Sequence, residues 1–346
     1  MRQAKGQPVE SSTTAAKAKA EAERLAEEIE NLGKRLQKVR SAIGVMIFGQ
    51  EQVIDQTLIT LLAGGHALLV GVPGLAKTRL AETLGKVFGL KERRIQCTPD
   101  LMPADILGSE VLEEGLDGRR SFRFIPGPIF TQVLMADEIN RASPRTQSAL
   151  LQAMQERRVT VAGQAHDLPA PFHVLATQNP LEQEGTYPLP EAQLDRFLMQ
   201  IDVTYPDYEA EREMLLMTTG PSEQLAEQVF NAEELLVAQK LVRRVPVGDQ
   251  LLDAILDTVR RGRPEVSELP EVRGHVAWGP GPRAGQALML AVRARALLEG
   301  RLAPSLDDLI ALAPPILRHR MALNFAARAD GVLLEDIIER LMEPYR

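Results

Sequence analysis

Apolar side chains near the start of the chain recur in steps of four and three residues. Such steps place side chains on one face of a helix, so the pattern predicts an amphipathic helix with charged residues on its other faces. The stripe consists of Ala18, Ala22, Leu25, Ile29, Leu32, Leu36, Val39 and Ile43. Gly33 interrupts it and weakens a helix by about 1 kcal/mol relative to alanine. Two interpretations stay open: packing on its own domain, or contact with a neighbouring subunit or partner.

The region from about residue 50 to residue 204 alternates short apolar runs with helical periodicity. Residues 78–88 have the helical period, and the apolar runs have the length of strands. The predicted strands are Ala67–Gly71, Ile95–Thr98, Val133–Ala136, Val174–Thr177 and Phe197–Val203. Continuous apolar runs are typical of strands that are buried on both faces. The fold class is therefore α/β, with a parallel sheet sandwiched between helices.

Two segments break this rhythm. Residues 99–130 contain short β-like pieces divided by glycines and are interpreted as an insertion, while residues 158–168 predict a hairpin. After residue 205 the pattern becomes helical, and proline and glycine separate the helices. The predicted organisation is a polar tail, unstructured over 1–14, with an amphipathic helix (1–40), an α/β domain (41–204) and an all-α domain (205–346).

Composition narrows the function classes. The 346 residues carry a net charge of −7, which disfavours nucleic acid as a partner. Cys97 is the single cysteine, so an internal disulfide and a cysteine metal cluster are excluded. The start of the chain lacks the apolar core of a signal peptide, and no apolar run is long enough for a membrane span. We expect a cytoplasmic protein.

A glycine-rich segment carries the first chemical signal. Residues 71–78, GVPGLAKT, follow a predicted strand and open a predicted helix, which is the context of a phosphate-binding loop. Backbone amides and the helix N-terminus favour bound phosphates. Lys77 would reach the β- and γ-phosphates of ATP, and Thr78 would ligate Mg²⁺. Ala76 stands where the strict pattern has glycine.

Carboxylates and an amide follow two further predicted strands. Asp137 and Glu138 end one apolar run, and Asn179 follows the next. In open α/β folds, ligands bind at the carboxyl edge of the strands. Asp137 would then hold Mg²⁺ through water, Glu138 would act as general base, and Asn179 would bind the attacking water or the γ-phosphate.

Two arginines complete the set of candidate catalytic residues. Arg196 precedes the last predicted strand, from where a guanidinium can reach the γ-phosphate of a neighbouring subunit. A surface pair with Asp195 is the alternative. Arg283 lies in the first turn of a helix, which is unfavourable against the helix dipole and favours a bound anion. We expect it to close the second domain over the phosphates.

These motifs, in this order, resemble the AAA+ ATPases and, in wording, the MoxR family. The resemblance covers roughly residues 40–345. Its segments are GVPGLAKT, CTPDLMPADILG, LMADEINRASPRTQSALLQAMQER, ATQNP, LPEAQLDRF and LAPPILRHR. It implies a P-loop AAA+ core followed by an all-α lid, with residues 99–130 as the helix-2 insert and residues 158–168 as the hairpin before sensor 1.

The resemblance also implies roles for single residues. It makes Asp137 and Glu138 the Walker B acids, Asn179 sensor 1, Arg196 the arginine finger and Arg283 sensor 2. The nucleotide-binding residues would be Gly49, Gln50, Gly71, Val72, Pro73, Gly74, Leu75, Ala76, Lys77, Thr78 and Arg79. Arg141 and Arg145 either face a neighbour's nucleotide or form salt bridges on a helix surface.

At the level of function, the resemblance implies an ATP-hydrolysing, chaperone-like remodeller that assembles as a hexameric ring. Such proteins work with a von Willebrand factor A domain partner and mature or activate a client enzyme. Three alternatives stay open: a nucleic-acid motor of the same clade, a metal-chelatase motor subunit, and a nucleotide-gated scaffold. The sequence names no client.

Overall fold

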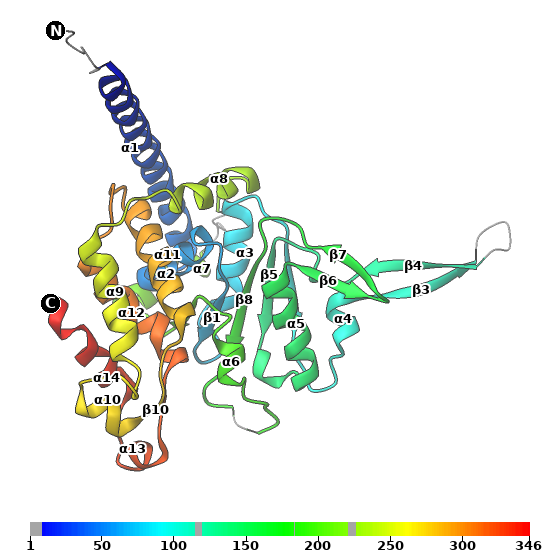
Figure 1. Cartoon of the computed structure of the whole chain (residues 1–346). Coiled ribbons are helices and arrows are strands. Elements are labelled where there is room, and N and C mark those ends of the chain that lie inside the picture. Colours follow the sequence, from blue (N-terminus) through cyan, green and yellow to red (C-terminus); the bar gives the residue numbers. More distant parts are fainter. Residues whose placement is uncertain (1–8, 115–119, 183, 221–225) are drawn as a thin grey trace, which may run out of the picture.

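The fold is described from a computed structural model, in which residues 9–114, 120–182, 184–220 and 226–346 are described. A five-stranded parallel sheet lies at its centre (Figure 1). The strand order is β2-β5-β8-β1-β9, with β1 Ala67–Val70, β2 Glu92–Gln96, β5 Val133–Asp137, β8 His173–Gln178 and β9 Met199–Asp202. The predicted parallel sheet is confirmed.

Neighbouring strand residues are buried in two different cores. Leu69 and Leu175 belong to the core that contains α2 (Glu51–Leu62) and α3 (Lys77–Val87). Leu68 and Val174 point to the other face and pack in the core of α5 (Pro144–Glu156). Because both faces of the sheet are covered, the inner strands β1, β5 and β8 each contain a continuous apolar run.

The edge strand β2 lies three residues earlier than the sequence predicted. The apolar run Ile95–Thr98 suggested the strand, whereas the backbone pairs from Glu92 opposite Val133 to Gln96 opposite Asp137. Most side chains of β2 are at least partly exposed, because an edge strand leaves much of its surface outside the core. Its polar residues therefore hid the strand from a search for apolar runs.

Two hairpins project from the same side of the sheet (Figure 1). The predicted insert contains α4 (Pro103–Leu107) and the pair β3 (Gly108–Glu114) and β4 (Arg120–Pro126). Residues 115–119 lie outside the described residues. The second hairpin pairs β6 (Arg158–Val161) with β7 (Gln164–Asp167). The Phe124 ring of the insert stacks on the His166 ring of the second hairpin, with centroids 4.0 Å apart.

The chain after residue 205 is largely helical. Its helices are α7 Tyr208–Thr218, α8 Ala232–Val242, α9 Asp249–Arg261, α10 Pro270–His275, α11 Pro282–Leu298, α12 Leu306–Leu317, α13 Phe325–Ala329 and α14 Leu334–Met342. One two-stranded pairing, β10 (Val276–Trp278) with β11 (Ala322–Leu323), is an addition that the helical pattern did not reveal.

The amphipathic stripe at the start of the chain forms α1 (Val9–Gly44). Its side chains Ile29, Leu36 and Val39 are buried in the core shared with α3 and α11. This part of the stripe thus packs on its own chain, while Ala22 is exposed. The helix starts within the segment expected to be unstructured, because residues 9–14 extend a helix whose later turns are held by packing.

Candidate functional site

The phosphate-binding loop connects β1 to α3 and needs unusual backbone geometry. A side chain at Gly71 would overlap the carbonyl oxygen of Val203, so the close approach of the chain after β9 requires glycine there. Gly74 has φ 87°. Ala76 adopts a left-handed conformation with φ 55° and ψ 17°, which explains why the strict pattern has glycine at this position.

Lys77 is the first residue of α3 and is tied to the loop. Its Nζ donates to the carbonyl oxygens of Gly71 and Val72, the latter at 3.1 Å. Burial lowers the pKa of Lys77, while the charges of Asp137 and Glu138 oppose that shift. Two carboxylates near the ammonium group therefore help to keep it charged at neutral pH.

Asp137 ends β5 and is held by three donors. Arg94 Nε donates to its Oδ2 at 2.6 Å, and Thr177 Oγ1 donates to its Oδ1 at 3.1 Å. Thr78 Oγ1 lies 3.5 Å from Oδ2. The hydroxyl of Thr78 and the carboxylate of Asp137 are thus adjacent, and both are oxygen ligands of the kind that Mg²⁺ takes beside phosphates.

Glu138 has a strained backbone that directs its side chain. Its φ of 54° and ψ of 52° are left-handed, a conformation that non-glycine residues adopt at a cost of about 1–3 kcal/mol and that clusters at active sites. The Glu138 amide donates to Thr177 Oγ1 at 2.8 Å. Its carboxylate accepts from Gln96 Nε2 at 2.8 Å and from Arg141 Nη1 at 3.2 Å.

One cavity of about 410 Å³ brings these residues together. It is lined by Pro73, Gly74, Leu75, Ala76, Lys77, Thr78, Arg79, Arg94, Gln96, Asp137, Glu138, Thr177 and Asn179. Asn179 is only 5% exposed, and its Oδ1 accepts from the amide of Leu181 at 3.1 Å. Among the described residues, no hydrogen-bond partner of the Asn179 side-chain nitrogen is found, and this group can donate to a ligand. Gly71 and Val72, expected as binding residues, do not line this cavity.

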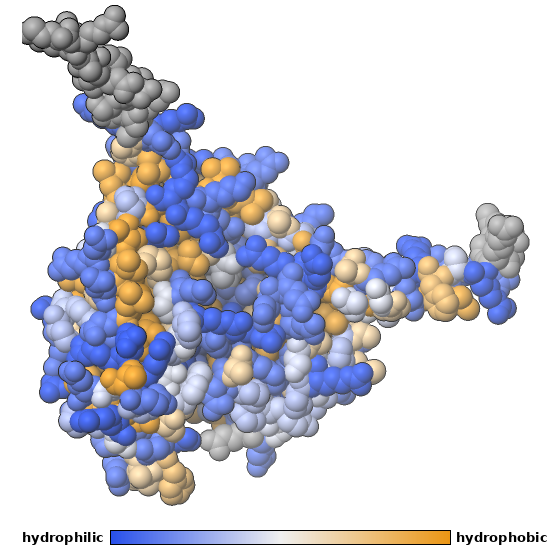
Figure 2. Space-filling model, viewed as in Figure 1, coloured by the Kyte–Doolittle hydropathy of each residue, from blue (hydrophilic) through white to orange (hydrophobic). Residues whose placement is uncertain are grey.

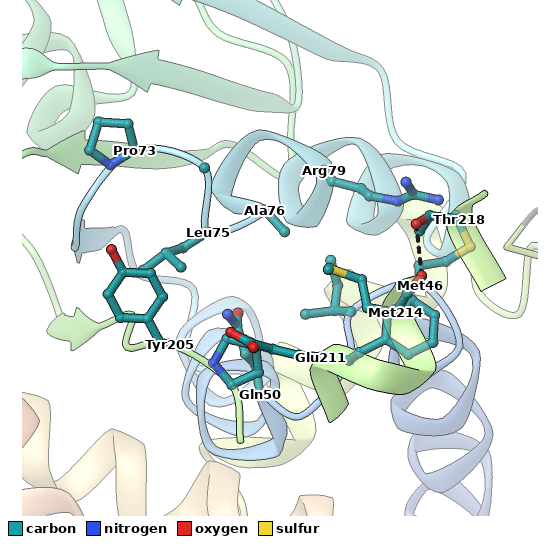
Figure 3. A pocket seen from close by; sticks show the side chains of 14 residues that line it. Met46, Gln50, Pro73, Leu75, Ala76, Arg79, Tyr205, Glu211, Met214 and Thr218 are labelled. Atoms are coloured by element: carbon teal, nitrogen blue, oxygen red, sulfur yellow. Dashed lines mark hydrogen bonds between the residues drawn. The ribbon is translucent and has the colours of Figure 1, made fainter. Parts of the chain in front are cut away.

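A second cavity of about 300 Å³ adjoins the first and shares Pro73 to Ala76 and Arg79 with it. Its lining is mainly apolar and includes Met46, Tyr205 and Met214, as Figure 3 shows. Gln50 lines it and donates to the carbonyl of Thr204 at 3.5 Å. A flat apolar slot beside a phosphate-binding loop suits the base of a nucleotide.

Gly49 lies between two residues that line the second cavity, Phe48 and Gln50. It does not line either nucleotide cavity, and its φ is 63°. A side chain there would overlap the Ala210 side chain, so glycine is required where α7 packs against the end of α1 and the segment before α2. Gly49 therefore positions α7 over the slot and does not itself form the wall.

Arg196 and Arg283 lie at the opposite edge of the sheet. They line a third cavity with His66, which precedes β1, whereas the phosphate loop follows β1. Arg283 Nη1 lies 3.5 Å from Asp195 Oδ2, and Arg196 Nε is buried without a hydrogen-bond partner among the described residues. Arg283 thus does not line the cavity of the phosphate loop, and its closing of the second domain over the phosphates stays a prediction. The packing of α11 places Arg283 beside Arg196.

Arg141 and Arg145 have different surroundings in the structure. Arg141 forms ion pairs within its own chain, with Glu138 at 3.2 Å and with Glu182 at 3.9 Å. Arg145 is exposed on the first turn of α5. Arg141 thus contacts Glu138, which favours the salt-bridge interpretation for this residue.

Three polar residues of the site escaped the sequence reasoning. Thr177 bridges Asp137 and the Glu138 amide, and its signal was a hydroxyl directly after the apolar run of β8. Arg94 and Gln96 lie two residues apart on β2 and so point to the same face of the sheet. Correct placement of the edge strand would have revealed both.

Comparison with known proteins agrees with this geometry. Residues 66–199 match the ATPase family associated with various cellular activities (AAA), and residues 271–341 match the AAA lid domain. The chain is 42% identical to Chaperone MoxR1 of Mycobacterium tuberculosis, over 93% of this chain and 84% of that protein. The chain belongs to the MoxR family of AAA+ ATPases.

Other relatives also match most of the chain. The family member named Protein MoxR of Paracoccus denitrificans is 31% identical over 84% of this chain and 89% of its own length. A crystal structure of a candidate ATPase from Cytophaga hutchinsonii superposes with a TM-score of 0.84 and 36% identity, covering 93% of this chain and 97% of that one. Among the described residues, no helix combines the length and apolar character that a membrane crossing demands.

Proposed function

We propose that this MoxR-family chain hydrolyses ATP with a site shared between two subunits of a ring. One observation carries the proposal. The phosphate loop, Asp137, Glu138 and Asn179 line one cavity, while Arg196 and Arg283 line another at the opposite edge of the sheet. One chain therefore cannot place both groups of residues on the same nucleotide. The phosphate loop and the acids come from one subunit, and the two arginines come from its neighbour.

The residues at the carboxyl edge fit MgATP. Loop amides and Lys77 bind the phosphates, and Thr78 and Asp137 hold Mg²⁺. The metal, when bound, neutralises charge on the phosphate oxygens. Glu138 orients the attacking water and takes up its proton, and Asn179 positions that water by hydrogen bonding. Gln96 and Arg141 both bind Glu138 Oε2, so they fix the direction in which the carboxylate points.

The residues at the other edge stabilise the transition state on the neighbour. A guanidinium group placed against the γ-phosphate offsets the charge that develops during transfer and accelerates hydrolysis by 10³–10⁵ where such fingers have been studied. Arg196 and Arg283 line one cavity. We propose that both reach the same neighbouring nucleotide, in a hexameric ring.

A mixing experiment tests this assignment. Glu138→Gln removes the base but leaves the arginines, and Arg196→Ala does the reverse, so each variant alone should be inactive. In an equimolar mixture, about a quarter of the sites combine an intact Glu138 with an intact neighbouring Arg196, and activity should return to that level. The same recovery is expected with Arg283→Ala. A mixture as inactive as its components would refute a shared site.

We further propose that the ring remodels a client enzyme together with a von Willebrand factor A domain partner. Support comes from the MoxR family and from a relative named as a chaperone. The Glu138→Gln protein should retain ATP and hold its client, so it serves as bait with and without ATP, and Lys77→Ala serves as a control that cannot bind nucleotide. Capture of DNA-bound replication proteins in place of an enzyme would indicate a nucleic-acid motor.

A further inference from the structure

The helical region carries a groove that takes no part in the site described above. It lies between α9 and α11, has a volume of about 770 Å³, and appears in Figure 2 as part of an apolar stripe on this face. Its walls include Leu252 and Leu256, which are 40% and 53% exposed. Leucines of one helix face are normally covered, so this groove presents an unpartnered apolar surface.

The rim of the groove is strongly basic. Arg243, Arg260, Arg263 and Arg293 line it, and no acidic residue does. Within the described part of the chain none of the four has an ion-pair partner, and Arg293 Nε is buried without a hydrogen bond. Burial and the nearby Arg243 lower the pKa of Arg293. An arginine cluster of this kind is stabilised by carboxylates from outside the chain.

Helix α7 has the complementary character. None of its residues is buried, and Tyr208, Leu215 and Leu216 are 77%, 57% and 62% exposed. Its charged residues are three glutamates and one arginine, at positions 209, 211, 213 and 212, and Asp207 caps its first turn. An acidic, apolar helix left on the surface matches a basic, apolar groove.

Position connects the two surfaces. The groove shares Gln286 and Leu290 with the cavity of Arg196 and Arg283. Helix α7 contributes Glu211, Met214 and Thr218 to the wall of the nucleotide slot (Figure 3). If two arginines of one subunit reach the phosphates of the next, the surface beside the arginines meets the surface beside that nucleotide.

We propose that α7 of one subunit docks into the α9–α11 groove of its neighbour. This inference rests on the proposed shared site, and it names the second copy of the chain as the occupant of the groove. The leucines of α7 cover Leu252 and Leu256, and its glutamates pair with the arginines at the rim. Since α7 also forms one wall of the nucleotide slot, the docked helix links nucleotide binding in one subunit to the lid of the next.

Site-directed cross-linking tests the contact directly. Cys97 is buried and burial raises its pKa to about 12, so the native chain offers no reactive thiol in its described part. Leu216→Cys and Leu256→Cys proteins, mixed with ATP and a short bismaleimide, should give a covalent dimer that neither forms alone. Val237→Cys is the matched control, because Val237 is 63% exposed on α8 outside the groove.

The outcomes separate the inference from the function on which it rests. A ring that sediments normally and hydrolyses ATP, yet gives no cross-link between positions 216 and 256, overturns the docking and leaves the shared site intact. Failure to assemble, together with hydrolysis independent of protein concentration, refutes the shared site and the docking with it.

Charge reversal provides a second measurement. The doubles Arg243→Glu/Arg260→Glu and Glu209→Lys/Glu213→Lys should each raise the protein concentration for half-maximal ATPase activity by about tenfold. A mixture of the two doubles should reach half-maximal activity at the parental concentration, because alternating subunits then pair opposite charges at every interface. Lys240→Glu on α8 is the control. Unchanged assembly combined with loss of fluorescent single-stranded DNA binding would assign the groove to nucleic acid and overturn the inference.

Discussion

Two buried histidines at the amino edge of the sheet are fixed in opposite tautomers. His66 Nδ1 accepts from the amide of Val174 at 2.9 Å, and His173 Nε2 accepts from the side-chain amide of Gln239 at 3.1 Å. The other nitrogen of each ring donates to a backbone carbonyl. Protonation would set a new N–H against an existing donor in both places. Burial is the main cause that lowers the pKa of His66 to about 3 and of His173 to about 4.

Stability should therefore fall as the solution becomes acidic. The folded pKa values lie below the unfolded value of about 6.5, so the unfolded state binds more protons between them. The free energy of unfolding should be constant above that value and fall below it, by up to about 1.4 kcal/mol per pH unit for each ring. Urea denaturation between pH 7 and pH 5 measures this slope. His66→Gln should make it shallower, and an unchanged slope would contradict the assignment.

The hydroxyl of Thr177 joins the two Walker B acids. It donates to Asp137 Oδ1 and accepts from the Glu138 amide, so it holds both residues with one atom. Thr177→Val keeps the shape and removes both bonds. ATP affinity should change little, because the phosphate loop is untouched, and kcat should fall by at least about tenfold as Glu138 loses its position. Thr177→Ser should restore activity, and equal rates in the valine variant would exclude a positioning role.

Among the helices and strands, the sequence predicted those that a local pattern defines and missed those that only long-range pairing defines. Helix α8 (Ala232–Val242) lies in the region predicted to be helical, and Asn231 and Glu234 form a capping box at its start. Strand β2 was misplaced because its backbone pairing with β5, and not an apolar run, defines it. The pairing of β10 with β11 joins segments more than forty residues apart, and no local pattern reports such a contact.

The candidate site also contains residues that could be placed from the sequence and residues that could not. Residues of the phosphate loop and Walker B strand could be assigned because local backbone geometry and strand order determine where they lie. The position of Arg283 could not, because it depends on how α11 packs against α1, α2 and α9. Local sequence indicated an anion near this residue, but only the tertiary structure shows at which edge of the sheet it lies.

Helix α1 offers a test in which helix propensity and packing disagree. A side chain added at Gly33 would lie 2.6 Å from Gly300 Cα, so the glycine permits the turn after α11 to approach α1. Propensity alone favours Gly33→Ala by about 1 kcal/mol. We expect the opposite sign, with a loss of about 1–3 kcal/mol, because overpacking shifts two backbones.

A second glycine in the same helix is the matched control. A side chain at Gly44 would meet no atom within 4 Å, so Gly44→Ala should be neutral or stabilising. Denaturant unfolding of both variants under one condition gives the comparison. If both substitutions stabilise the protein, the contact between α1 and the turn at Gly300 is looser than the structure indicates.

In the whole molecule, a single core connects the sheet to the helical region. The cluster that buries Leu69 and Leu175 of the sheet also contains Leu36 of α1 and Leu288 of α11. The helical lid therefore does not pack as a separate body, and its position relative to the sheet is fixed by shared apolar contacts. This arrangement holds Arg283 of the lid beside Arg196 of the core.

Arg320 reinforces that arrangement with hydrogen bonds. It lies in the short turn Arg318–Arg320, is 2% exposed, and donates to Asp195 Oδ1 at 2.7 Å. It also donates to the carbonyl oxygens of Phe197, Leu198 and Ile316. One guanidinium group thus joins the lid to the segment that carries Arg196.

Loss of this group should damage hydrolysis without weakening ATP binding. Arg320→Met leaves buried carbonyls unpaired and Asp195 without its main partner, which should cost about 3–5 kcal/mol of stability. The nucleotide cavities lie at the other edge of the sheet, so the affinity for ATP should stay close to that of the parent. Arg196 and Arg283, which we propose act on a neighbour's nucleotide, lose their support, and kcat should fall. Arg320→Lys keeps the charge but loses the planar guanidinium with its several donors. Its kcat should lie between those of the parent and of Arg320→Met. The variant and parent are compared at the same concentration of assembled rings. Equal kcat values would show that Arg320 stabilises the fold and has no part in placing Arg196.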